Sequence, residues 1–172
     1  MRNGVSGGSA ILRPVRRLIT AILLVAALAG CSSDDTAPSA NFIPGGVDAF
    51  KKKLESERGK PVVVNKWASW CAPCRLEFPF FRDQAKKRKG EVVFLGVNSN
   101  DSRGEAEDFL EEEPVPFKNF SDPKLEIAAE FNGVQAFPST AFYDSKGKLV
   151  FVHQGGYPSE KELAADIDRY AR

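Results

Sequence analysis

The chain has 172 residues, 42% of them hydrophobic, which suits one domain with a buried core plus shorter appendages. Residues 1–30 contain four arginines and no acidic residue, so residues 31–172 carry 20 basic and 23 acidic side chains, a net charge of −3. This slightly acidic balance argues against a nucleic-acid partner, because proteins that bind nucleic acids normally present a basic face.

The first 30 residues have the pattern of a secretion signal. A basic stretch ends at Arg17, and an apolar run of 11 residues, 18–28, follows it. A bilayer needs about 20 apolar residues, so this run fits the core of a signal peptide better than a membrane helix. The run ends in the letters LAGC, which resemble a bacterial lipobox. We therefore expect lipid attachment at Cys31 and anchoring to the extracytoplasmic face of the cytoplasmic membrane. The alternative is cleavage nearby, which leaves Cys31 as a free thiol.

Residues 31–46 are rich in Ser, Asp, Ala, Pro and Gly and are predicted to form a flexible tether. A helical stripe of apolar residues follows over 47–54. Residues 61–67 are β-branched and nearly all apolar, as in a strand covered on both faces. The next helix is predicted over 71–89, and a second buried strand over 91–98. These three elements form a β-α-β unit, which implies a parallel pair with a right-handed crossover. The buried face of the helix is predicted to carry Cys74, Phe78, Phe81 and Ala85, and Pro79 should kink it.

Two helices are predicted after this unit. The first covers 105–113 and ends at the prolines that follow. For the second, Asp122 supplies an N-cap and Pro123 a first-turn proline. We expect this helix to run to about Phe131 and to end at Gly133.

The last part of the chain reads as a hairpin and a helix. Strands are predicted over 139–143 and 149–153, joined by a turn at 144–147. Ser159 then caps a final helix. A parallel pair followed by an antiparallel hairpin is the layout of a three-layer α/β/α domain with a mixed central sheet, here over 47–172.

The sequence Trp-Cys-Ala-Pro-Cys at 70–74 lies where a buried strand gives way to a helix. Two thiols three residues apart on a first helical turn are close enough to form a small-loop disulfide. The helix N-terminus favours a thiolate, so Cys71 should have the lower pKa and be the attacking sulfur, with Arg75 adding positive charge nearby. Cys74, one turn further in, should be buried and should resolve a mixed disulfide.

A cysteine pair at this spacing also has other uses in proteins. A zinc site needs two more ligands, and only Cys31 in the tether and His153 remain. A purely structural disulfide would close too short a loop to stabilise the fold much. A copper chaperone would need His153 near the motif, although its place on a strand favours an ordinary hydrogen-bonding role. No metal and no cofactor is expected.

Residues 64–75, VNKWASWCAPCR, resemble the active-site strand and helix of the thioredoxin superfamily, and the TlpA/ResA-like branch fits best. The resemblance covers about 47–172 and implies the thioredoxin-like fold. Pro79 stands where the family kinks its long helix, and the two-helix insertion around 104–131 suits this branch. Phe137-Pro138, just before a strand, matches the family's cis-proline.

This resemblance implies further site residues. Pro138 would face the cysteine pair, and the backbone of Phe137 would bind an extended substrate segment. Glu77 would be half-buried and relay the proton of Cys74, the alternative being a solvated glutamate that complements the helix dipole. Trp70 is expected to shield the active site and contact substrate. Lys66 departs from the family pattern, which has an apolar residue there, and a pairing with Glu77 is one hypothesis.

The implied function is an extracytoplasmic thiol–disulfide oxidoreductase that exchanges disulfides with protein substrates. The resemblance favours a reductase, for example in cytochrome c maturation with apocytochrome c as substrate, recharged by a membrane thiol carrier. A disulfide-forming oxidase for secreted proteins remains the main alternative, because the reduction potential that sets the direction cannot be read from the residues.

Overall fold

The computed structural model describes residues 41–172. The predicted signal peptide (1–30), the predicted lipidation site Cys31 and most of the predicted tether lie outside this range. In chain order the elements are β1 (Phe42–Ile43), α1 (Gly46–Ser56), β2 (Val62–Trp67), α2 (Ala72–Lys87), β3 (Val93–Ser99), α3 (Arg103–Glu112), β4 (Lys118–Asp122), α4 (Glu126–Glu130), β5 (Ser139–Tyr143), β6 (Leu149–Gln154) and α5 (Glu160–Tyr170).

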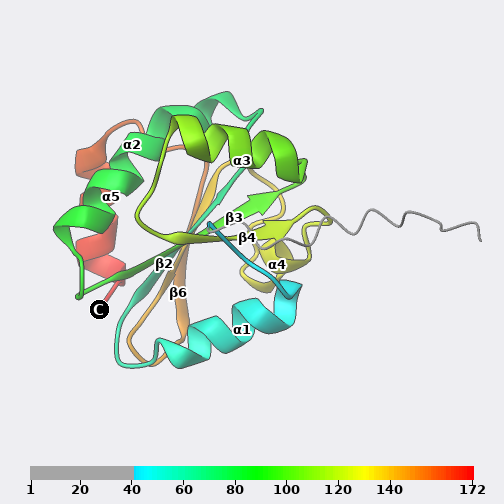
Figure 1. Cartoon of the computed structure of the whole chain (residues 1–172). Coiled ribbons are helices and arrows are strands. Elements are labelled where there is room, and N and C mark those ends of the chain that lie inside the picture. The colour runs from blue at the N-terminus through cyan, green and yellow to red at the C-terminus, as the bar shows by residue number, and fades with distance from the viewer. Residues whose placement is uncertain (1–40) are drawn as a thin grey trace, which may run out of the picture. The chain divides into compact units, whose positions relative to one another are not determined.

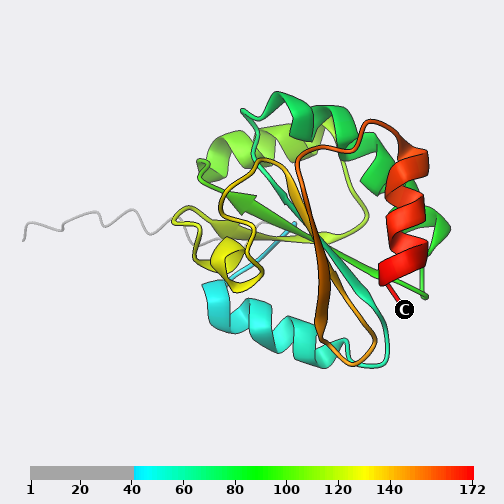
Figure 2. The same cartoon turned by 180° about the vertical axis from the view of Figure 1, so that it is seen from behind.

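The described strands form one mixed sheet in the order β1-β4-β3-β2-β5-β6. β1, β4, β3 and β2 run parallel to their neighbours, whereas β5 pairs antiparallel with both β2 and β6. Figure 1 shows α1 and α4 on one side of this sheet and α2, α3 and α5 on the other. Figure 2, the view from behind, shows α5 beside α2. The predicted three-layer α/β/α fold with a mixed sheet is confirmed.

Strand β2 is buried along its whole length and sends alternate side chains to the two layers. Val62 and Val64 join the core under α1 and α4. Val63 packs with the core under α2 and α5, and Trp67 with the cluster that contains the two cysteines of α2. The strand is therefore nearly all apolar because both of its faces are covered.

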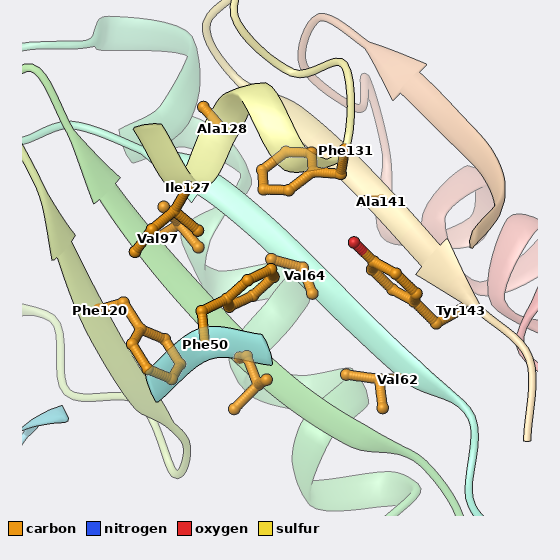
Figure 3. Packing of buried hydrophobic residues seen from close by; sticks show 11 residues of the cluster. Phe50, Val62, Val64, Val97, Phe120, Ile127, Ala128, Phe131, Ala141 and Tyr143 are labelled. Carbon is orange, nitrogen blue, oxygen red and sulfur yellow. The ribbon is translucent and has the colours of Figure 1, made fainter. Parts of the chain in front are cut away.

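Aromatic side chains fill the core between the sheet and the α1–α4 layer. Phe50 of α1 meets the ring of Phe120 edge-on at 5.4 Å between centroids, and Phe131, which follows α4, lies 6.2 Å from it. Figure 3 shows these rings together with Ile127 of α4 above the valines of the sheet. This packing fixes α4 and the loop that follows it against the sheet, and that loop leads to the active site.

Two helix predictions at the active site agree with the structure. The predicted inner face of α2 is buried at all four positions, Cys74, Phe78, Phe81 and Ala85, and Pro79 lies inside this helix. Ser159 caps α5, because its side chain accepts the backbone N–H of Glu162. Within residues 41–172 no helix is long and apolar enough to cross a membrane.

The strand β4 is absent from the predicted order of elements, which was wrong at this point. Its sequence, KNFSD, has only one apolar residue, so no apolar run marks it. The strand lies between β1 and β3, and its buried Asn119 accepts a hydrogen bond from Trp67 Nε1 at 2.9 Å. Asp122 ends β4 and is not the N-cap residue of the next helix. Its carboxylate instead reaches forward and accepts the backbone N–H groups of Ile127 and Ala128.

The predicted tether is also too long at its carboxyl end. Phe42 and Ile43 form β1 and pair with Asn119 and Phe120 of β4. The side chain of Phe42 is buried against the cluster that contains the cysteines. A two-residue strand gives no periodic pattern, so the sequence did not reveal that the folded domain begins before residue 47.

Candidate active site

A disulfide joins the cysteines at the start of α2. The sulfurs of Cys71 and Cys74 are bonded at 1.98 Å, with 5.3 Å between their Cα atoms. Cys71 is the N-cap residue of α2, and its sulfur accepts the backbone N–H of Cys74 at 3.2 Å. In the reduced protein this N–H and the positive end of the helix dipole favour negative charge on the sulfur of Cys71. The geometry is that of a reactive first thiol followed by a second thiol one turn inside the helix.

Both cysteines are buried in this oxidised state. Cys71 is 3% exposed and Cys74 is 1% exposed, so the expected contrast between an open and a hidden sulfur is small. Apolar side chains surround the pair, among them Trp67 and Phe78. A substrate sulfur reaches the disulfide only through the small exposed part of Cys71, and the residues beside that opening control the approach.

Two aromatic rings and two prolines lie beside the disulfide. Trp70 is 54% exposed, and its ring centroid is 4.9 Å from that of Phe137, which packs against the cysteine cluster. The Phe137–Pro138 peptide bond is cis, as expected from the resemblance. A Cβ atom on Gly156 would contact Pro73 at 3.5 Å and Pro138 at 3.7 Å, so Gly156 lies close to both prolines. The structure thus places all the predicted substrate-facing residues at one end of the sheet.

Glu77 is fully buried and bound by two donors. One carboxylate oxygen accepts the side-chain amide of Asn65 at 2.8 Å, and the other accepts the backbone N–H of Tyr157 at 2.9 Å. Burial raises its pKa from 4.5 to about 7, although both hydrogen bonds act in the opposite direction. Because Glu77 lies three residues after Cys74 on α2, the two side chains share a helix face. A solvated glutamate is excluded, and a buried carboxyl group with a raised pKa shares a helix face with Cys74.

The hypothesis that Lys66 pairs with Glu77 is wrong, because the two lie on opposite sides of the sheet. Lys66 is fully buried, and its Nζ donates to the carbonyl oxygen of Gly133 at 2.5 Å. The same Nζ lies 3.6 Å from the centre of the Phe137 ring. Burial lowers the pKa of Lys66 to about 8, while the nearby carboxylate of Asp122 raises it.

The loop after β3 supports the turn between β2 and α2. Asp101 accepts the backbone N–H of Ser69 at 2.6 Å and its hydroxyl at 2.9 Å, and it also accepts the amide of Asn98 at 2.7 Å. Asn100, with a positive φ of 50°, presents its carbonyl oxygen to Trp70 Nε1 at 2.9 Å. These hydrogen bonds are not among the features predicted from the sequence. An Asn-Asp pair directly after a buried strand was the available signal, since both residues favour such turns.

Arg75, the residue after the second cysteine, contacts three groups other than the disulfide. Its guanidinium group lies over the Phe109 ring at 4.5 Å and is 3.5 Å from the carboxylate of Glu112. It also reaches the carbonyl oxygen of Ser69 at 3.4 Å. The charge of Arg75 is therefore partly balanced by the carboxylate of Glu112.

His153 lies on the α5 side of the site. Its ring stacks on that of Tyr157 with centroids 4.1 Å apart, and Nδ1 is 3.6 Å from a carboxylate oxygen of Asp166. The hydroxyl of Tyr157 donates to that same oxygen at 2.9 Å. Among residues 41–172, no three side chains of the His, Cys, Asp or Glu type are placed to hold a metal ion.

Known proteins are similar to this chain in sequence and in fold. The profile of the Redoxin family matches residues 32–167. The thioredoxin-like protein YneN of Bacillus subtilis is 31% identical over 121 residues, which are 69% of each chain. The thiol-disulfide oxidoreductase ResA of the same organism is 29% identical over 116 residues, 67% of this chain and 64% of that protein. The crystal structure of a putative thiol:disulfide interchange protein DsbE from Chlorobium tepidum superposes with a TM-score of 0.62 at 31% identity, covering 67% of this chain and 83% of the other.

Proposed function

We propose a direction, a proton path and a location for the chemistry of this chain, which belongs to the Redoxin family, has the thioredoxin-like fold and is a thiol–disulfide oxidoreductase. The proposed activity is reduction of disulfides in protein substrates outside the cytoplasm. The observation that carries the proposal is the Cys71–Cys74 disulfide at the start of α2, with the carboxyl group of Glu77 buried one turn further along.

The reaction starts from the reduced pair. The thiolate of Cys71 attacks one sulfur of the substrate disulfide, a mixed disulfide forms, and the other substrate sulfur leaves as a thiolate that takes a proton from water. Cys74 passes its proton to Glu77 and attacks the sulfur of Cys71. This step forms the Cys71–Cys74 bond and releases the second substrate thiolate. Two electrons have moved from the cysteine pair to the substrate, and a membrane thiol carrier would restore the pair.

The environment of Cys74 supports the direction of reduction. When Glu77 is ionised, its negative charge disfavours a thiolate on the neighbouring Cys74. A reduced form that lacks strong thiolate stabilisation gives its electrons away more readily, whereas strong oxidants of this fold have a stabilised reduced form. The helix N-terminus acts in the opposite sense at Cys71, and the oxidase alternative depends on that effect being dominant.

The reduction potential of the cysteine pair decides between the two directions. We expect equilibration of the purified protein with dithiothreitol buffers to give a reduction potential of about −270 mV, in the range of thioredoxin. A reduction potential of about −120 mV, in the range of the strong oxidant DsbA, would contradict the reductase and favour the disulfide-forming oxidase.

The proton path through Glu77 is tested in the reduced protein. In Glu77→Gln the side chain keeps its size but cannot ionise or accept a proton. We expect the thiolate absorbance of Cys74 to appear at lower pH than in the wild type, because the neighbouring negative charge is gone. Cysteine pKa values that are the same in both proteins would remove Glu77 from the mechanism.

The proposed location and partners rest on the sequence. The LAGC motif at residues 28–31 supports lipidation at Cys31 and a position on the extracytoplasmic face of the membrane. Resemblance to the TlpA/ResA-like branch supports apocytochrome c as one substrate. Cells that lack this protein should then contain less cytochrome c with covalently bound haem, and an added thiol reductant should restore it.

A further inference from the structure

The buried ammonium group of Lys66 lies against Phe137, one of the two aromatic residues beside the disulfide. Its side chain leaves β2 on the face opposite to Glu77 and reaches the loop between α4 and β5. There it donates to the carbonyl oxygen of Gly133 at 2.5 Å and, more weakly, to that of Val134 at 3.5 Å. The ring of Phe137, further along the same loop, lies 3.6 Å from Nζ.

The ring of Phe137 connects this lysine to the disulfide. One contact of the ring is Lys66, and another is Trp70, the residue directly before Cys71, at 4.9 Å between centroids. Trp70 is held in turn from the opposite side by the carbonyl oxygen of Asn100. Because Cys71 is only 3% exposed, the side chains that surround it restrict the approach of a substrate.

Stabilisation of the fold does not explain a lysine at this position. A buried charge loses its hydration, and an apolar residue of similar shape is often neutral or stabilising in its place. An ammonium group over a ring face, by contrast, attracts the ring with a strength that grows when water is excluded. The contacts of Lys66 therefore favour a role in placing Phe137.

We propose that Lys66 is a positioning residue, whose ammonium group fixes the loop at 133–137 and holds Phe137 against Trp70. The two rings together form a surface that binds the segment flanking a substrate disulfide. This inference rests on the proposed function, because it assumes that protein disulfides approach Cys71 beside Phe137. The recognised group is an extended apolar segment that carries a cysteine.

The kinetic test uses the full chain with Lys66→Met, Phe137→Leu and the double variant, and Lys146→Met as the control. Lys146 is exposed in the β5–β6 turn, so its replacement removes the same charge far from the rings. The substrates are insulin, a protein disulfide, and 5,5′-dithiobis(2-nitrobenzoic acid), a small disulfide that needs no flanking segment. For Lys66→Met we expect the KM for insulin to rise about tenfold, the effect of losing a desolvated cation–π contact, with kcat and the small-disulfide rate unchanged.

The double variant shows whether the lysine acts through the ring. If Lys66 acts by placing Phe137, adding Lys66→Met to Phe137→Leu raises the KM no further. Effects that multiply would overturn the inference, as would an unchanged KM in Lys66→Met. Equal losses with both substrates, together with a lower melting temperature, would reduce Lys66 to a structural role.

A spectroscopic readout is independent of activity. Trp67 is buried, whereas Trp70 is half-exposed, so acrylamide quenching of fluorescence reports mainly on Trp70. In Lys66→Met the quenching constant should rise to the value found for Phe137→Leu, because the ring no longer covers Trp70. Quenching equal to the wild type refutes the positioning role. If quenching rises but no variant changes the KM for insulin, the proposed substrate surface fails and the inference that depends on it falls as well.

Discussion

Adjacent residues of β2 serve opposite sides of the active site. Asn65 faces α2 and donates to Glu77, while Lys66 faces the other layer and contacts the Phe137 ring. A strand directs successive side chains to opposite faces. Two adjacent residues of β2 therefore support Glu77 on one face of the sheet and the ring of Phe137 on the other. A substitution at either position should therefore affect a different part of the reaction.

The carboxyl group of Glu77 should make stability depend on pH. Its pKa is about 7 in the folded protein against 4.5 for an ordinary glutamate, so the folded state holds an extra proton between these values. Glu77 therefore adds to the free energy of unfolding at low pH. This stabilisation is fully present below the pKa of the unfolded state and is lost as the pH rises through the pKa of the folded state. In urea denaturation of the oxidised protein, the free energy of unfolding of the wild type should fall by about 3 kcal/mol relative to that of Glu77→Gln as the pH rises from below the lower pKa to above the higher one. A difference between the two proteins that does not change with pH would contradict the raised pKa.

At the scale of elements, β3 approaches its neighbours too closely for a side chain at one position. A Cβ atom on Gly96 would lie 1.8 Å from Asn119 Oδ1 of β4 and 3.0 Å from Trp67 Nε1 of β2. The hydrogen bond between these two side chains crosses directly over the glycine. Gly96 therefore allows a buried indole and a buried amide to satisfy each other above the sheet.

Replacing this glycine should disrupt the sheet. We expect Gly96→Ala to lower the free energy of unfolding by about 1–3 kcal/mol, the usual range for overpacking a core, because the methyl group displaces Asn119. Gly104→Ala is the matched control, since a Cβ there meets nothing within 4 Å and lies in α3. That variant should be as stable as the wild type or slightly more so, because alanine favours helix. Denaturation curves that are equal for the two variants would show that β4 adjusts without loss.

Considered as a whole, the described domain assembles its active site from distant parts of the chain. The cysteines come from the β2–α2 junction, Phe137 and Pro138 from the loop before β5, and Tyr157 from the segment after β6. These segments meet because β2, the last strand of the parallel part of the sheet, pairs directly with β5, the first strand of the antiparallel part.

The proposed membrane attachment is a property of the complete chain. Replacing Cys31 with serine removes the thiol that would carry the lipid, and the folded domain keeps both redox cysteines. In fractionated cells the wild-type protein should sediment with membranes, and Cys31→Ser should move to the soluble fraction, because no acyl chain then holds it at the bilayer. Equal partition of both proteins would show that Cys31 is not the anchor.

Much of the fold was predictable because its central elements carry strong patterns. The strand at 61–67, the helix at 71–89 and the hairpin at 139–153 were found from apolar runs, helical spacing and turn residues, and all three are present. The cysteine pair stood out because two thiols at the start of a helix have few other uses. The roles of Glu77 and Pro138 came from resemblance and remain predictions.

The sequence by itself determined the layered fold and the position of the thiol chemistry, because periodicity and a short motif are local properties. Tertiary structure decided the rest. β4 is a strand because it pairs with β1 and β3, and Asn119 finds its buried partner in Trp67. The pKa of Glu77 is raised to about 7 because the folded chain buries its carboxyl group away from water. It also decided that Lys66 lies under Phe137. Each depends on contacts between residues far apart in the chain, and such contacts leave no periodic signal.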